Sequence, residues 1–121
     1  MADPFVLDAI PVAIGSGAAI SAQINIGQKT PVAIAVPANW TTAALSFQAS
    51  GDGGATFGEL LDATATAVSV SSITGGAYTV IQLDPTKWRG INCLKVRSGS
   101  SGAPVNQTNS VTLQLLTRFV F

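Results

Sequence analysis

Apolar and polar residues alternate one by one along most of this 121-residue chain. Between residues 20 and 26, isoleucine and alanine hold the even positions and polar residues hold the odd ones. Such a spacing of two places alternate side chains on opposite faces of a strand. No stretch of about ten residues shows the spacing of three to four that an amphipathic helix requires. The pattern therefore predicts an all-β chain.

The predicted strands are short, and turn-forming residues separate them. They lie near residues 20–26, 32–36, 45–49, 57–61, 67–71, 78–83, 92–97 and 111–121. Residues 72–76 would form the turn of a hairpin, and Asp84 with Pro85 would begin one helical turn. About eight antiparallel strands of this kind predict a β-sandwich or a jelly roll.

The chain is long enough for one domain, but two segments stand apart from the sandwich pattern. Residues 1–18 are apolar, and Pro4 and Pro11 interrupt them. They form either an extended N-terminal arm or an ordinary edge strand, which leaves residues 19–121 as the sandwich domain. Residues 98–107 form the longest polar loop, which is either a contact loop or a solvated connection.

The chain carries six acidic and six basic residues and no histidine, so its formal net charge is zero. Zero net charge argues against nucleic-acid binding, which needs a basic surface. The N-terminus shows neither a signal peptide nor a membrane span, so we expect synthesis in the cytoplasm. Charged residues make up 10% of the chain, against about 25% in ordinary domains. Such a composition suits a subunit that is embedded among others.

Candidate catalytic groups are few. Without histidine, no side chain titrates near neutral pH unless it is perturbed. A glycosidase would need two converging carboxylates, one of them with a raised pKa, but Asp52 fits a turn better and Asp84 fits a helix cap. The single Cys93 lies in an apolar run and is expected in the core. We predict no enzymatic activity, no metal and no other cofactor.

Residues 50–57 read Ser-Gly-Asp-Gly-Gly-Ala-Thr-Phe. This segment resembles the Asp-box of sialidase propellers, in which an Asp side chain accepts hydrogen bonds from nearby backbone N–H groups. The resemblance implies a structural β-hairpin rather than sialidase activity, because a propeller needs several blades of four strands. The hairpin would be organised by Ser50, Asp52, Gly54, Thr56 and Phe57.

The tryptophans and the basic residues allow two interpretations each. Trp40 and Trp88 would form either an exposed platform that stacks on sugar rings or caps at the ends of the core. The basic residues concentrate at Lys87, Arg89, Lys95 and Arg97. They form either a solvated face or contacts to an acidic neighbour.

Four segments are together similar to small virion proteins of tailed bacteriophages: PANWT at 37–41, LSFQASGDGG at 45–54, LKVRSG at 94–99 and APVNQ at 103–107. These proteins decorate or cement the capsid or form head-associated fibres. The resemblance implies a trimeric β-sandwich on the virion surface, bound to the major capsid protein. The alternative is a receptor- or carbohydrate-binding module of a head or tail fibre. Candidate subunit contacts are Phe5, Leu7, Ile10, Val12, Arg97, Phe119 and Phe121.

Overall fold

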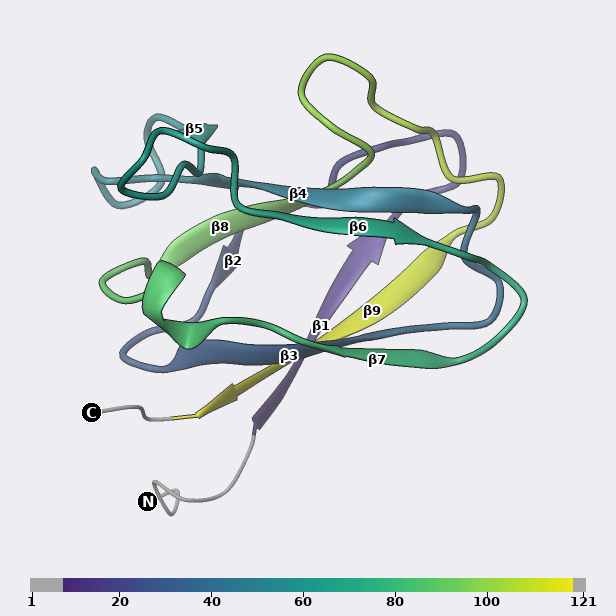
Figure 1. Ribbon diagram of the computed structural model, residues 1–121, viewed down its shortest axis with the longest axis horizontal. Coiled ribbons are helices and arrows are strands. Elements are labelled where there is room, and N and C mark those ends of the chain that lie inside the picture. Colours follow the sequence, from purple (N-terminus) through teal and green to yellow (C-terminus); the bar gives the residue numbers. More distant parts are fainter. Residues whose placement is uncertain (1–7, 119–121) are drawn as a thin grey trace.

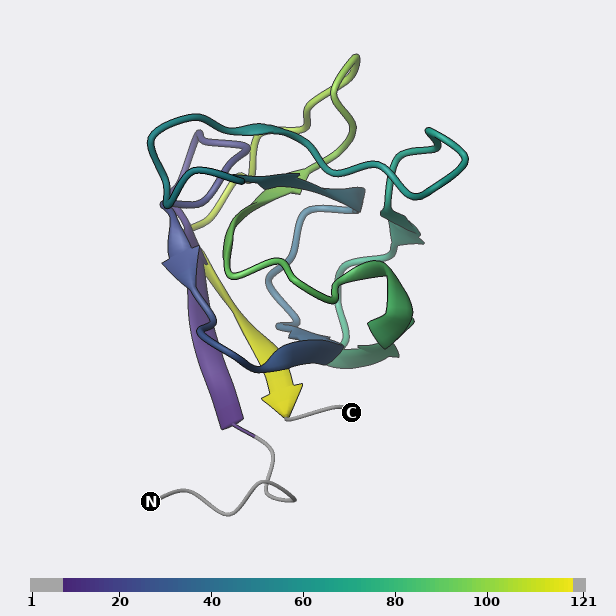
Figure 2. The same cartoon turned by 90° about the vertical axis from the view of Figure 1, so that its left-hand side faces the viewer.

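The computed structural model of the protein describes residues 8–118. It shows two antiparallel β-sheets packed face to face (Figures 1 and 2). The described residues form nine strands and a single 3-10 turn, η1 (Pro85–Lys87). The predicted all-β sandwich is therefore confirmed. No helix within residues 8–118 has the length and hydropathy that crossing a membrane would require.

We call the two layers sheet A and sheet B. Sheet A has the spatial order β1 (Asp8–Ile14), β9 (Val111–Arg118), β3 (Thr30–Val36) and β7 (Thr79–Gln82). Sheet B contains β2 (Ile24–Asn25), β8 (Cys93–Ser98) and β4 (Ala43–Ala49) in that order. Two further strands, β6 (Ser69–Ile73) and β5 (Gly58–Glu59), both pair with β4.

The strand pairing identifies a jelly roll. β1 pairs with β9, β2 with β8, β3 with β7 and β4 with β6. The first half of the chain thus pairs with the second half in reverse order, as one long antiparallel ribbon. The pairs β3–β9 and β4–β8 then fold this ribbon into two sheets, which is the jelly-roll arrangement. The short β5 lies in the connection from β4 to β6 and corresponds to the strand expected near residues 57–61. The strand that raises the expected eight to nine is β1.

Alternation along the strands fills the core between the sheets. In β9, Val111, Leu113 and Leu115 are buried while Thr112 is exposed. The rings of Phe47 and Trp88 meet edge to face in this core, with their centroids 4.5 Å apart. Cys93 is buried as predicted. Removing these apolar side chains from water is the main force that holds the two sheets together.

Residues 8–14 form an edge strand, which corrects the expectation of an arm over residues 1–18. β1 pairs with β9 along its whole length, from Asp8 opposite Thr117 to Ile14 opposite Val111. Its inward side chains are buried because they complete the apolar core between the sheets. Residues 1–7, where the rest of the expected arm falls, lie outside the described residues.

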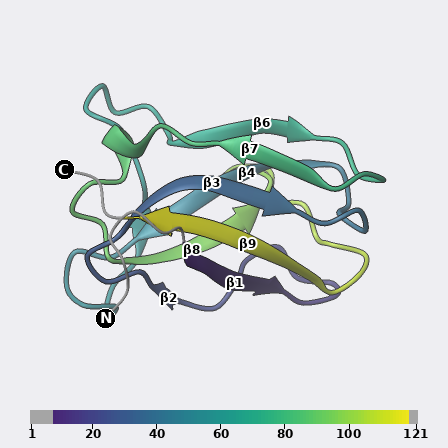
Figure 3. The ribbon, with the colours of Figure 1, turned by 90° about the horizontal axis from the view of Figure 1, so that it is seen from below.

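The predicted hairpin over residues 72–76 is wrong, because β6 and β7 belong to different sheets. Residues 74–78 carry the chain across the sandwich, and the two strands run along the same side of the molecule (Figure 3). Gly75 is required in this crossing, since a Cβ there would overlap the main-chain oxygen of Trp40. The predicted cap at Asp84 is confirmed: its Oδ1 accepts a hydrogen bond from Thr86 N at 3.0 Å, and Pro85 occupies the first position of η1.

Candidate functional site

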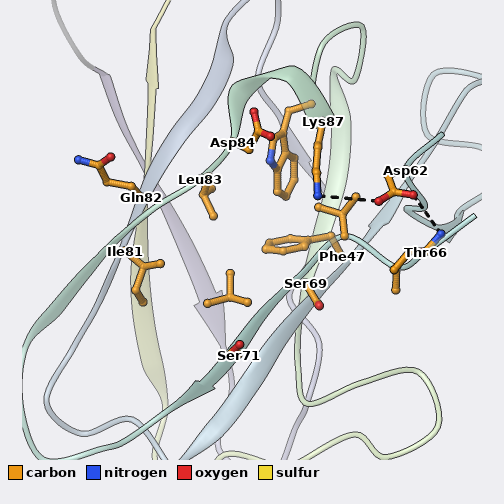
Figure 4. Close-up of a pocket in the computed structure, with 14 residues that line it drawn as sticks. Phe47, Asp62, Thr66, Ser69, Ser71, Ile81, Gln82, Leu83, Asp84 and Lys87 are labelled. Atoms are coloured by element: carbon orange, nitrogen blue, oxygen red, sulfur yellow. Dashed lines mark hydrogen bonds and ion pairs between the residues drawn. The ribbon is translucent and has the colours of Figure 1, made fainter. Parts of the chain in front are cut away.

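A crevice opens between β6 and β7, where the edges of the two sheets lie on the same side (Figure 4). Its volume is about 450 Å³, and the rings of Phe47 and Trp88 line its inner end. A second hollow of about 510 Å³ continues along the same strands and shares Val70, Ser71 and Ile81 with it. Each volume falls in the range of about 300–1,000 Å³ that is usual for ligand sites.

Charged groups stand at one end of this crevice. Lys87 Nζ lies 3.8 Å from Asp62 Oδ2, and Asp84 belongs to the same lining. Both aspartates already accept hydrogen bonds from their own turns. The rest of the lining is mixed: Thr66, Ser69, Ser71 and Gln82 contribute polar side chains beside the apolar side chains of Val70, Ile81 and Leu83.

Three aspartates within the described residues hold pKa values below the usual range. The hydroxyl of Ser50 and the backbone N–H of Thr56 lower the pKa of Asp52 from 3.8 to about 2. The hydroxyl of Thr64 is the main cause of the lowered pKa of Asp62. The hydroxyl of Thr86 does the same for the pKa of Asp84. None of the three can serve as the protonated acid that a glycosidase needs near neutral pH.

These lowered pKa values predict a loss of stability in acid. A carboxylate whose pKa is depressed by folding stabilises the folded state above its unfolded pKa, and this contribution disappears as the pH falls through the folded pKa. We expect the urea midpoint of unfolding to decline between about pH 4 and pH 2. Asp52→Asn should make this decline shallower. A midpoint that rises over this interval would contradict the assignment.

The loop that resembles an Asp-box is an internally bonded turn between β4 and β5. Ser50 Oγ donates to Asp52 Oδ1 at 2.7 Å and accepts from Gly54 N at 2.9 Å, and Asp52 Oδ1 also accepts from Thr56 N at 2.9 Å. The predicted hairpin is confirmed by the pairing of β4 with β5. Lys95 Nζ lies over the ring of Phe57, 4.4 Å from the ring centroid. These contacts give the loop a structural role.

Arg97 is buried and forms an ion pair within the chain, so its prediction as a subunit contact is wrong. Its Nη2 lies 2.6 Å from both carboxylate oxygens of Glu59, and its Nε donates to Ser46 Oγ at 2.9 Å. The residue is 7% exposed. Burial follows from these partners, because β8 and β5 flank β4 and bring the two charges together across it.

Both tryptophans are core residues, so of the two interpretations the core position is confirmed and the sugar-binding platform is wrong. Trp40 is 3% exposed and Trp88 is 1% exposed. Trp40 Nε1 donates to Ala43 O at 3.4 Å, and Trp88 packs on Phe47. A stacking platform needs an open ring face, and burial between the sheets removes it. The alternative function of a carbohydrate-binding module loses its main support.

The remaining candidate contacts divide into two groups. Val12 is fully buried and Ile10 packs against the core from β1, so both serve the fold instead. Their side chains point inward because they share the inner face of sheet A with Ile14. The other candidates lie outside the described residues: Phe5, Leu7, Phe119 and Phe121.

Sequence reasoning missed Gln107, which is fully buried at the end of the polar loop 98–107. Its Oε1 accepts from Thr41 N at 2.7 Å, while its Nε2 donates to Thr41 O at 3.1 Å and to Ser98 Oγ at 2.7 Å. The loop is thereby anchored to the chain that follows Trp40. Nothing in the local sequence distinguishes this glutamine from a solvated one.

Sequence reasoning also missed the outer face of sheet A. Alternation turns one side of each strand away from the core, and the register aligns these residues in rows such as Pro11–Gln114–Ala35–Val80. In the described strands, charge enters this face only at Arg118, at the end of β9. We call the uncharged part the neutral face: Ala9, Pro11, Ala13, Ala33, Ala35, Val80, Gln82, Thr112, Gln114 and Leu116. Ala33 and Ala35, on the central strand β3, are themselves buried.

Among residues 8–118, no three His, Cys, Asp or Glu side chains gather as a metal-ligand set. Comparison of the chain with protein families, with curated proteins and with solved structures finds no match.

Proposed function

We propose that this chain is a non-enzymatic structural protein of a bacteriophage particle, which decorates or cements the capsid through subunit contacts. The neutral face of sheet A is the observation that carries the proposal. An antiparallel sheet that faces water ordinarily places polar residues outside, and charged side chains are mostly found on protein surfaces. Here alanine, proline, leucine and valine accompany uncharged polar residues across four strands. Depletion of charge is typical of the centre of a protein interface.

Two further observations support this proposal. The jelly roll is common among viral capsid proteins, although lectins and other proteins share it, so the fold weighs less than the surface. In addition, Asp52, Asp62 and Asp84 accept hydrogen bonds within their own turns, while Asp8 pairs with Lys29 and Glu59 pairs with Arg97. A structural role needs none of these groups for chemistry.

The size of the neutral face indicates how such a protein would bind. The four strands lie about 4.8 Å apart. Three of them have seven or eight residues and β7 has four, so together they cover roughly 400–450 Å². A stable interface buries about 800 Å² on each partner. One subunit would therefore bind the major capsid protein weakly, and an array of linked or neighbouring subunits would bind strongly because many identical contacts act together.

The proposal is tested by adding the purified protein to capsids of the phage that encodes it. We expect binding and an increase in the temperature at which the capsids disrupt. Gln114→Glu adds one charge at the centre of the neutral face with almost no change in shape, so it should weaken binding about tenfold or more.

Gln48→Glu provides the matched control, because Gln48 is equally half-buried but lies in sheet B beside Lys95 and Glu59. It should leave capsid binding unchanged. Absence of binding by the unaltered protein would overturn the proposal. An equal effect of the two variants would show that sheet A is not the contact surface.

A further inference from the structure

Four of the five edge strands within residues 8–118 carry features that prevent pairing with another strand. β1 contains Pro11, which lacks an N–H group, and Asp8 at its start. β2 and β5 have only two residues each. The pairing of β6 with β4 is irregular between Ala43 and Leu45. Proline, charge, shortness and bulges are the means by which proteins block exposed edges.

The fifth edge strand, β7, contains no proline, no charged residue and no break in its pairing. Its pairing with β3 is regular from Val36–Thr79 to Ala33–Gln82, and residues 77–83 contain neither a charged residue nor a proline. Leu83 N donates to Val32 O at 3.0 Å. Because main-chain groups alternate in direction along an antiparallel strand, those of Val80 and Gln82 point away from β3. They form an open row of donors and acceptors.

Side chains at this edge are also exposed and apolar. Tyr78 is 69% exposed and Val80 is 50% exposed. They are two of the four large apolar side chains that are exposed within residues 8–118. An edge with open main-chain groups and exposed apolar side chains is suited to accept another strand.

We propose that β7 pairs with β7 of a second copy in antiparallel orientation, about a two-fold axis at Val80. Val80 would then lie opposite Val80 of the second copy, and Tyr78 would lie opposite its Gln82. The two A sheets would join into one continuous eight-stranded sheet, which also extends the neutral face. This inference does not depend on a role in a virion.

The strand that pairs with β7 comes from a second copy of the chain, because this edge is complementary to itself. In a two-fold strand pair, each side chain meets its own equivalent or a near neighbour, so any charge would face a like charge. Residues 77–83 avoid this repulsion because they are uncharged. With one unprotected edge per chain in the described strands, pairing stops at two copies and produces a closed dimer rather than a fibre.

The first test measures mass and amide exchange of the purified full chain over a range of concentrations. We expect twice the monomer mass of 12.3 kDa at high concentration. We also expect the amide protons of Val80 and Gln82 to exchange more slowly as the dimer forms. A monomer at all concentrations, a trimer, or a dimer in which these two amides stay unprotected would overturn the inference.

The second test places a charge at the proposed axis. Val80→Lys would set two ammonium groups against each other and should raise the dissociation constant of the dimer at least about tenfold. Thr112→Lys is the matched control, because it adds the same charge to the same sheet face on β9, away from β7. It should leave the dissociation constant unchanged.

Val80→Pro offers a second variant that removes the outward N–H group and keeps the bonds to β3. It should also abolish the dimer. A dimer that survives both changes at Val80 would overturn the inference. If the protein is monomeric but Val80→Pro, which adds no charge to the neutral face, abolishes capsid binding, the edge serves an extended strand of the capsid protein, and self-pairing is refuted.

Discussion

Replacing Trp88 with alanine is expected to lower the free energy of unfolding by about 3–5 kcal/mol. Trp88 is the largest of the fully buried side chains, and its ring meets Phe47 at an interplanar angle of 83°. Alanine would remove these contacts and leave a cavity that opens into the crevice between β6 and β7. Urea unfolding, followed by circular dichroism at a concentration where the protein is monomeric, measures the loss.

Tyr78→Ala is the matched control for this prediction. Tyr78 is also aromatic but is 69% exposed, so its loss should change the stability of the monomer by about 0.5 kcal/mol or less. Iodide provides an independent check, because it should quench little of the tryptophan fluorescence while both indoles are buried. A Trp88→Ala variant that is as stable as Tyr78→Ala would contradict the core position and revive the sugar-binding interpretation.

The sequence predicted the strands well wherever one face of a strand is buried. In β9, alternation follows directly from the contact of one face with the core. The hairpin at residues 72–76 failed for a different reason. Gly75 and Gly76 indicate a turn locally, but the partners of β6 and β7 are β4 and β3, which lie far away in the sequence. Local turn signals carry no information about which sheet a strand joins.

In the candidate site, too, the sequence predicts contacts between neighbouring residues but not contacts between residues that are far apart in the chain. The turn at Asp52 was predicted because its hydrogen-bond partners lie two to four residues away. Arg97 was misread as a contact because Glu59 lies 38 residues away and reaches it only across β4. The two tryptophans were ambiguous, since a bulky aromatic residue is compatible with a core or with a binding surface. Their burial depends on the tertiary arrangement.

Replacing Arg97 with methionine is expected to lower the free energy of unfolding by about 2–4 kcal/mol. Methionine keeps much of the apolar stem but leaves the Glu59 carboxylate without its guanidinium partner and Ser46 without the Nε donor. Removing one member of a fully buried ion pair costs about 3–5 kcal/mol. The expected loss is smaller here because the side chain of Glu59 is 22% exposed and retains some contact with water.

Two further variants distinguish the effect of losing the ion pair from the effect of losing one positive charge on β8. Lys95→Met removes a cation from the same face of the same strand, where Lys95 Nζ lies over the Phe57 ring. It should cost about 0.5–1 kcal/mol. Adding Glu59→Gln to Arg97→Met should restore part of the lost stability, because it removes the unpaired charge. Strictly additive effects at residues 59 and 97 would show that the two side chains are not coupled, and Arg97 would again be a candidate for contact with a neighbouring subunit.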